Sequence, residues 1–138
     1  ALPIFSGVAD EKLCEIASRR RGPVPLAVLM RALEELAVRN NTDCVAAVEE
    51  LALSSSGDLA LRAIGTLGRL KVPRTVLTLG RLTLSNEGSI AWAATYAIAD
   101  IGGPDAVRAL EIIAGQSVRP TLGLEAARLA ESLRERGR

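Results

Sequence analysis

The residues with the chemistry for catalysis are few in this sequence, and their spacing does not bring them together. Glu34-Glu35 and Glu49-Glu50 are pairs of adjacent carboxylates. Neighbouring residues diverge around a helix, so the pairs predict solvated faces and not an acid and a base on one substrate. The segment Gly65 to Gly68 lacks the Gly-Lys-Ser/Thr ending of a phosphate loop. It predicts a turn or close helix packing.

The sequence contains no histidine. This removes the commonest general base, the Ser-His and Cys-His nucleophile pairs, and histidine as a metal ligand. Cys14 and Cys44 alone do not complete a zinc site, and without a CxxC pairing they favour two buried, reduced side chains over a disulfide. We therefore expect no metal, no cofactor and no enzymatic activity.

Charge and hydropathy point to a small protein of the reducing cytoplasm. The 138 residues carry 17 basic and 16 acidic side chains, a net charge of +1 that gives no global field for nucleic acid or an anionic membrane. No apolar run approaches the roughly 18 residues of a membrane span, and the N-terminus lacks the layout of a signal peptide. The sequence predicts a soluble, cytoplasmic protein with no membrane partner.

The apolar residues repeat with a period of 31. Leu36, Leu67 and Ile98 superpose in this register, as do Pro73 and Pro104. Within each unit, apolar residues recur at three- and four-residue spacing, which is one face of a helix. The period predicts helix pairs at 25–39 with 43–54, 58–70 with 73–84, and 89–101 with 104–115, with lone helices at 9–20 and 121–136.

The turns between these segments carry helix stop and start signals. Gly102 to Asp105 is predicted to end one helix and begin the next, because glycine suits the closing geometry and proline suits a first turn. Asp58 and Ser89 are predicted as N-caps. Arg19 to Arg21 is predicted to end the first helix, where cations oppose the helix dipole.

The fold class that follows is all-α. We expect a right-handed α-solenoid of about 3.5 stacked antiparallel helix pairs, with about 8 helices. One domain covers 1–138, divided into a capping helix at 1–24, helix-pair repeats at 25–57, 58–88 and 89–119, and a capping helix at 120–138.

The stretch Ile90 to Val107, read as IAWAATYAIADIGGPDAV, resembles the HEAT-like repeats of the phycobilisome-lyase type. An aliphatic residue, a small pair, an aliphatic-glycine ending and a Gly-Pro-Asp turn carry the resemblance. It extends loosely over 25–136 and departs from the pattern at Lys71, where the turn glycine is expected. The resemblance implies a stacked helical fold and carries no activity.

Second helices of such stacks line the concave side, so their residues outside the core stripe are the first candidates for partner binding. The charge along this strip runs from acidic to basic to mixed, which would suit a charged peptide or helix. The alternative is an ordinary solvated face. The candidate residues are Asp43, Glu50, Arg74, Leu77, Thr78, Arg81, Arg108 and Ile112.

Trp92 and Tyr96 form a secondary candidate, because an exposed aromatic pair four residues apart would be a binding hot spot. Packing between repeats is the favoured alternative. Gly65 and Gly68 would leave a hollow that a neighbouring aromatic ring could fill.

These observations together favour a non-catalytic scaffold or adaptor that holds a protein or peptide partner on the concave face. Two alternatives stay open. One is a repeat protein that binds nucleic acid through its scattered arginines, and the other is a non-catalytic subunit or chaperone of an enzyme, such as a lyase-like complex. The sequence leaves the oligomeric state open.

Overall fold

The protein is all-helical in a computed structural model that describes residues 7–19 and 22–137, and these residues contain no strand. The predicted all-α class is thus confirmed, and each predicted helix is present. The elements are α1 (Asp10–Ser18), α2 (Leu26–Val38), α3 (Val45–Ser54), α4 (Gly57–Leu70), the 3-10 turn η1 (Pro73–Thr75), α5 (Val76–Leu82), α6 (Gly88–Ile101), α7 (Gly103–Gln116) and α8 (Pro120–Arg136).

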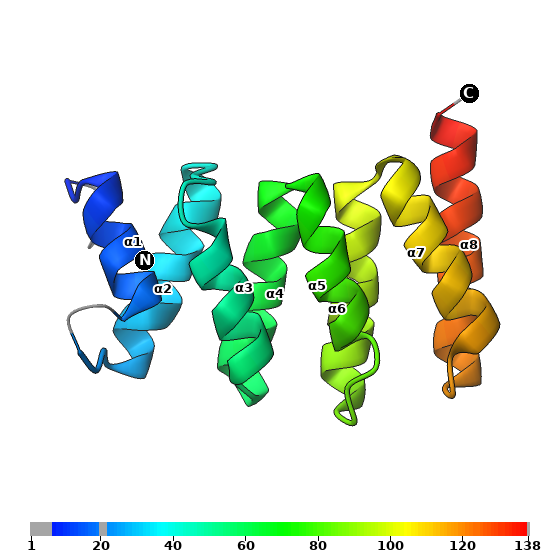
Figure 1. Ribbon diagram of the computed structural model, residues 1–138, viewed down its shortest axis with the longest axis horizontal. Coiled ribbons are helices and arrows are strands. Elements are labelled where there is room, and N and C mark those ends of the chain that lie inside the picture. The colour runs from blue at the N-terminus through cyan, green and yellow to red at the C-terminus, as the bar shows by residue number, and fades with distance from the viewer. Residues whose placement is uncertain (1–6, 20–21, 138) are drawn as a thin grey trace.

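The helices lie in two rows (Figure 1). The odd-numbered helices α1, α3, α5 and α7 contact one another in order along one row, and the even-numbered helices α2, α4, α6 and α8 do so along the other. Each odd helix from α3 onward lies more extensively against the helix that follows it than against the helix that precedes it. Among helices consecutive in the chain from α3 onward, the most extensive pairs are therefore α3 with α4, α5 with α6 and α7 with α8, one helix out of step with the pairs predicted from the period.

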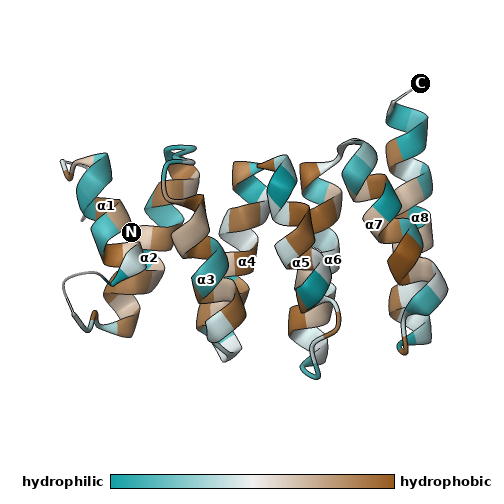
Figure 2. Cartoon of the chain, in the orientation of Figure 1, coloured by the Kyte–Doolittle hydropathy of each residue, from teal (hydrophilic) through white to brown (hydrophobic). Residues whose placement is uncertain are grey.

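The core follows the 31-residue register. Leu36, Leu67 and Ile98 in the even row are completely buried. Every helix consequently alternates hydrophobic and hydrophilic segments along its length (Figure 2). Leu53 and Leu84 are exceptions, because both occupy the repeated apolar register and both are exposed.

Backbone conformation explains where the helices end. Gly102, between α6 and α7, and Gly103, the first residue of α7, adopt φ values of 70° and 87°, as the predicted glycine turn requires. Lys71 takes the left-handed conformation after α4, with φ of 54°, at the position where a glycine was expected. The predicted N-caps Asp58 and Ser89 were wrong: both lie inside the first turn, because α4 begins at Gly57 and α6 at Gly88.

The two cysteines are joined, and the prediction of free thiols was wrong. Cys14 of α1 forms a disulfide with Cys44, the residue before α3, across a Cα–Cα distance of 5.5 Å. The bond ties the first odd helix to the second. It also removes the argument that the sequence offered for a reducing compartment.

The two ends of the helical array differ. Arg19 ends α1 in a left-handed conformation with φ of 57°, while Arg20 and Arg21 lie outside the described residues. At the other end, α8 extends past its neighbours (Figure 1), and it buries Leu122, Gly123, Ala126, Leu129 and Ala130. No helix in the described part of the chain is both long enough and apolar enough to cross a bilayer.

Candidate functional site

Two of the three intervals between successive odd helices are closed by side chains, and the third is open. The disulfide between Cys14 and Cys44 closes the interval between α1 and α3. A buried carboxylate closes the next interval, between α3 and α5. The interval between α5 and α7 is open, and it forms the candidate site.

Glu49 is the carboxylate between α3 and α5, and it is only 9% exposed. It accepts a hydrogen bond from Arg74 Nη1 at 2.7 Å, as a salt bridge, and a second one from the hydroxyl of Thr78. Buried carboxylates are stabilised when their oxygens accept hydrogen bonds from a cation and a hydroxyl in this way. The interval between α3 and α5 is thereby filled with satisfied polar groups.

The same positions one repeat later lack the groups that would close the interval. A shift of 31 residues places Gly80 at the position of Glu49 and Ala109 at that of Thr78. The cation is also lost, because Asp105 stands in the place of Arg74. A Cβ atom added to Gly80 would meet no atom within 4 Å, so the space beside this glycine is empty.

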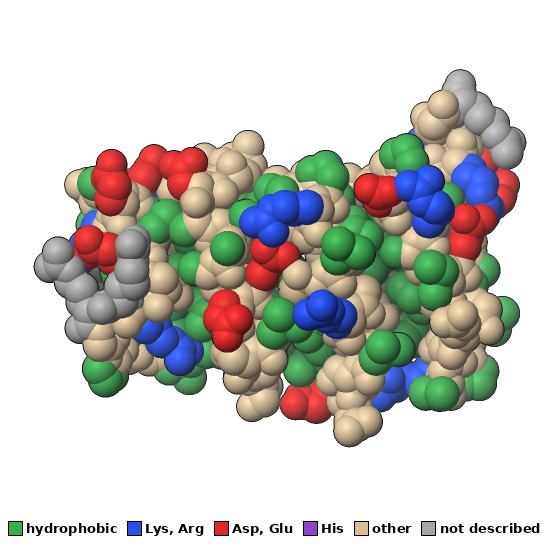
Figure 3. Space-filling model, viewed as in Figure 1, with side chains coloured by type: hydrophobic (Ala, Val, Ile, Leu, Met, Phe, Trp, Pro, Cys, Tyr) green, Lys and Arg blue, Asp and Glu red, His purple; other side chains and the backbone are tan. Residues whose placement is uncertain are grey.

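The result is a groove of about 860 Å³ between α5 and α7, which we call the α5–α7 groove. Its aliphatic side chains are unusually exposed: Leu77 by 79%, Leu84 by 81%, Ile112 by 58% and Val118 by 91%. Hydrophobic side chains gather over these two helices on the face seen in Figure 3. The groove is lined by Pro73, Arg74, Val76, Leu77, Gly80, Thr83, Leu84, Ser85, Asn86, Asp105, Arg108, Ala109, Ile112, Ile113, Gln116, Ser117, Val118 and Arg119.

Charged side chains stand at both ends of the groove. Arg74 and Arg108 lie at the end where α5 and α7 begin, and Arg108 forms an exposed ion pair with Asp105. Arg119 lies at the end where α7 stops, and its Nη2 donates to the carbonyl of Asn86 at 3.1 Å. Arg74 is paired with Glu49 and Arg108 with Asp105, so Arg119 leaves the groove with a net positive charge, and aliphatic side chains lie between the ends.

The structure brings together four of the eight residues predicted to bind a partner. Arg74, Leu77, Arg108 and Ile112 all line the α5–α7 groove. The other four do not: Thr78 bonds to Glu49, Arg81 is exposed outside the groove, and Asp43 and Glu50 are exposed on or next to α3.

Among the groove residues that sequence reasoning did not predict, four matter most to the argument: Gly80, Leu84, Val118 and Arg119. Leu84 repeats Leu53 in the 31-residue register and was not among the predicted binding residues, although it is 81% exposed. Val118 and Arg119 lie between predicted helices, where periodicity gives no signal. Gly80 could have been identified from the sequence. It lies 31 residues after Glu49, at the equivalent position on α5, and it has no side chain.

Trp92 and Tyr96 lie on α6, in the other row, and do not line the groove. Their ring centroids are 6.1 Å apart, and the Tyr96 hydroxyl donates to Glu125 of α8 at 2.6 Å. Hydrogen bonds from Arg128 and Tyr96 lower the pKa of Glu125 to about 2. The bond to Glu125 raises the pKa of Tyr96 in turn. Tyr96 therefore links α6 to α8.

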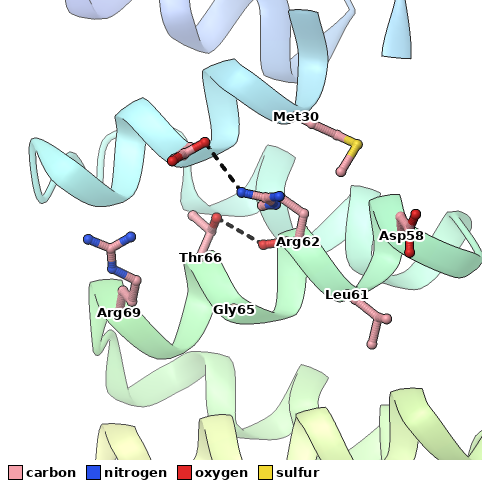
Figure 4. A pocket seen from close by; sticks show the side chains of 8 residues that line it. Met30, Asp58, Leu61, Arg62, Gly65, Thr66 and Arg69 are labelled. Atoms are coloured by element: carbon pink, nitrogen blue, oxygen red, sulfur yellow. Dashed lines mark hydrogen bonds and ion pairs between the residues drawn. The ribbon is translucent and has the colours of Figure 1, made fainter. Parts of the chain in front are cut away.

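The hollow predicted beside Gly65 is present and is not filled by an aromatic ring. It has a volume of about 530 Å³, between α2 and α4. A Cβ atom added to Gly65 would meet nothing within 4 Å. Figure 4 shows Arg62 reaching across this pocket, where it pairs with Glu34 at 3.3 Å. Gly68 differs, because a Cβ atom added to it would lie 3.2 Å from the Cα atom of Ala97 on α6.

Within 7–19 and 22–137, no three cysteine, aspartate or glutamate side chains come close enough together to hold a metal ion. The sequence matches no model of a known protein family and no curated protein.

Proposed function

We propose that the chain is a HEAT-like α-solenoid, without catalytic activity, that binds another protein in the α5–α7 groove. The proposal has two parts, the stacking of the repeats and the use of the groove. The residues that link neighbouring helices support the first part, and the exposure of the groove supports the second.

Most side-chain links between different helices join residues about one repeat apart, although Arg74–Glu49 and Arg134–Glu111 span 25 and 23 residues. The disulfide spans 30 residues, the bond from Tyr96 to Glu125 spans 29, and the bond from Thr66 to the Leu33 carbonyl spans 33. A stack in which each unit touches only its neighbours produces this pattern. The links therefore favour a solenoid over a bundle around one central core.

The observation that carries the binding function is the opening at Gly80. The preceding interval holds Glu49, whose carboxylate joins α3 to α5, whereas the corresponding position on α5 has no side chain. The aliphatic side chains of the groove remain in water as a consequence. Contiguous exposed apolar patches with a polar rim mark interaction sites on soluble proteins.

Selection from a displayed library of random peptides of about 15 residues, long enough for four helical turns, tests this function. Enriched peptides are then mapped by chemical-shift changes on the isotope-labelled protein. We expect the largest shifts at Leu77, Gly80 and Ile112. Peptides that map elsewhere, or the absence of any specific binder, would refute the use of the groove.

A variant that introduces the side chains of the closed α3–α5 interval into the α5–α7 groove is expected to lose peptide binding. Gly80→Glu, Asp105→Arg and Ala109→Thr together place the Glu49, Arg74 and Thr78 side-chain types at the equivalent positions. The variant is expected to keep its helical circular dichroism and to lose binding of the selected peptides. Gly115→Glu is the control, because it adds the same carboxylate to α7 at an open position outside the groove.

A further inference from the structure

The structure points to one class of occupant for the α5–α7 groove. We infer that it takes a short amphipathic helix of a partner protein, with an aliphatic stripe and carboxylates at both ends. This inference rests on the proposed function and specifies the chemistry of the partner.

The walls of the groove favour a helix over an extended peptide. An extended peptide binds by pairing with the edge of a sheet, and the described residues contain no strand. A polyproline segment binds in a groove lined by aromatic rings, and no aromatic residue lines this one. The remaining common mode places the apolar face of an amphipathic helix into an aliphatic groove.

The dimensions fix the length of the segment. The groove follows the chain from Arg74 to Leu84, roughly 15 Å at the rise of a helix. A helix lying along it needs about three turns, with aliphatic residues three or four positions apart. Leu77 of α5 and Ile112 of α7 stand on opposite walls of the groove, where they would contact this stripe.

The charges at the ends of the groove determine the sign of the charges expected on the partner. Arg119 pairs with no carboxylate among the described residues, and its bond to the Asn86 carbonyl holds it at one end. At the other end, both side chains of the pair Arg108–Asp105 are about two-thirds exposed. Exposed pairs of this kind contribute little, so a partner carboxylate can engage Arg108 at small cost. The groove therefore selects a helix with acidic residues beyond both ends of its aliphatic stripe.

The same features weigh against nucleic acid as the occupant. A phosphate backbone calls for a continuous row of cations, and here an aliphatic floor separates Arg119 from Arg108. Single strands are held by stacking of bases on aromatic rings, which this lining lacks.

Fluorescence anisotropy with three synthetic peptides tests the inference. The first peptide carries leucines at helical spacing flanked by glutamates, the second has lysine in place of each glutamate, and the third has the composition of the first in scrambled order. We expect the first to bind at least about tenfold more tightly than the second, and to weaken as NaCl rises from about 50 to about 500 mM. The scrambled peptide is expected not to bind.

Charge reversal on the protein supplies the reciprocal test. Arg108→Glu with Arg119→Glu is expected to reverse the preference, so that the lysine peptide binds more tightly than the glutamate peptide. Arg81→Glu is the matched control, because it makes the same change on α5 outside the groove, and it is expected to alter neither affinity more than about twofold. The salt dependence of the unmodified protein keeps the test decisive if the double variant does not fold.

Several outcomes would overturn the inference. These are equal binding of the glutamate and lysine peptides, equal binding of the scrambled peptide, displacement by a duplex DNA, and dimerisation of the protein through the groove in sedimentation experiments. If library peptides map to the groove without a preference for carboxylates, the inference fails and the proposed function stands. If no peptide maps there, both fail.

Discussion

Two glycines in the same helix offer a sharp test of how the even row packs. Gly65 and Gly68 lie one turn apart in α4. A Cβ atom at Gly65 would meet nothing within 4 Å, whereas a Cβ atom at Gly68 would lie 3.2 Å from both the Cα and the Cβ of Ala97 on α6. The contact involves helix backbone, which cannot give way without a shift of α6 against α4.

The magnitudes follow from these distances. Replacing a helical glycine by alanine stabilises a protein by about 0.5–1 kcal/mol through lower conformational entropy of the unfolded chain. Gly65→Ala should show this gain alone. Gly68→Ala should also show an overpacking cost of about 1–3 kcal/mol. The gain is common to both variants, so the difference between their free energies of unfolding isolates the contact with Ala97.

The assay is urea denaturation followed by circular dichroism at 222 nm, with both variants and the unmodified protein in parallel. We expect Gly65→Ala to be more stable than the unmodified protein and Gly68→Ala to be less stable. A Gly68→Ala variant as stable as Gly65→Ala would refute the close approach of α4 and α6. A similar slope against urea in all three proteins is the control that the same surface unfolds.

Three further predictions concern the ends and turns of the helical array. Loss of the disulfide in Cys14→Ser with Cys44→Ser should cost up to about 3–4 kcal/mol from its 30-residue separation, and hydrogen exchange should accelerate in α1 far more than in α6. Lys71→Gly should stabilise the protein by about 1 kcal/mol, measured by urea denaturation, because the left-handed conformation suits glycine. The lowered pKa of Glu125, caused first by Arg128, means that its contribution to stability is present above its ordinary pKa and is lost as the pH falls towards 2. Arg128→Gln should therefore raise the pKa of Glu125 in a carboxyl NMR titration and lessen the loss of stability between about pH 5 and 2.

The repeat period was enough to predict the helices, because burial on one face imposes its spacing on every unit. Leu36, Leu67 and Ile98 are buried at the same position for this reason. The period could not say which helices lie closest, since shifting the unit by one helix leaves the sequence pattern unchanged. Nor did it identify Leu84 as exposed, because the register marks a residue as apolar but does not show whether the next unit covers it.

The residues of the candidate site could be predicted only in part from their position on the helix. Leu77 and Ile112 were predicted as contacts because they lay off the core stripe, and both line the groove. Thr78 met the same criterion, yet its hydroxyl bonds to Glu49. A position outside the core stripe can face solvent or the next helix of its own row. These two environments are distinguished by whether the neighbouring helix of the row offers a side chain to bind, and that side chain belongs to a residue about one repeat away.

The disulfide shows how the period itself could have been used for this purpose. In a stack, residues one period apart occupy the same place in adjacent units, so they are neighbours in space however far apart they are in sequence. Cys14 and Cys44 are 30 residues apart in a chain with a period of 31. Their separation, which argued against a bond when judged by motif spacing, is the separation that places two side chains in contact across one interval. The same rule pairs Glu49 with Thr78, and at the equivalent positions one repeat later Gly80 and Ala109 both line the open groove. The sequence therefore predicts the groove through the absence of two side chains that close the preceding interval. This absence is found by comparing the contacts that equivalent residues of each repeat would make, in addition to their hydropathy.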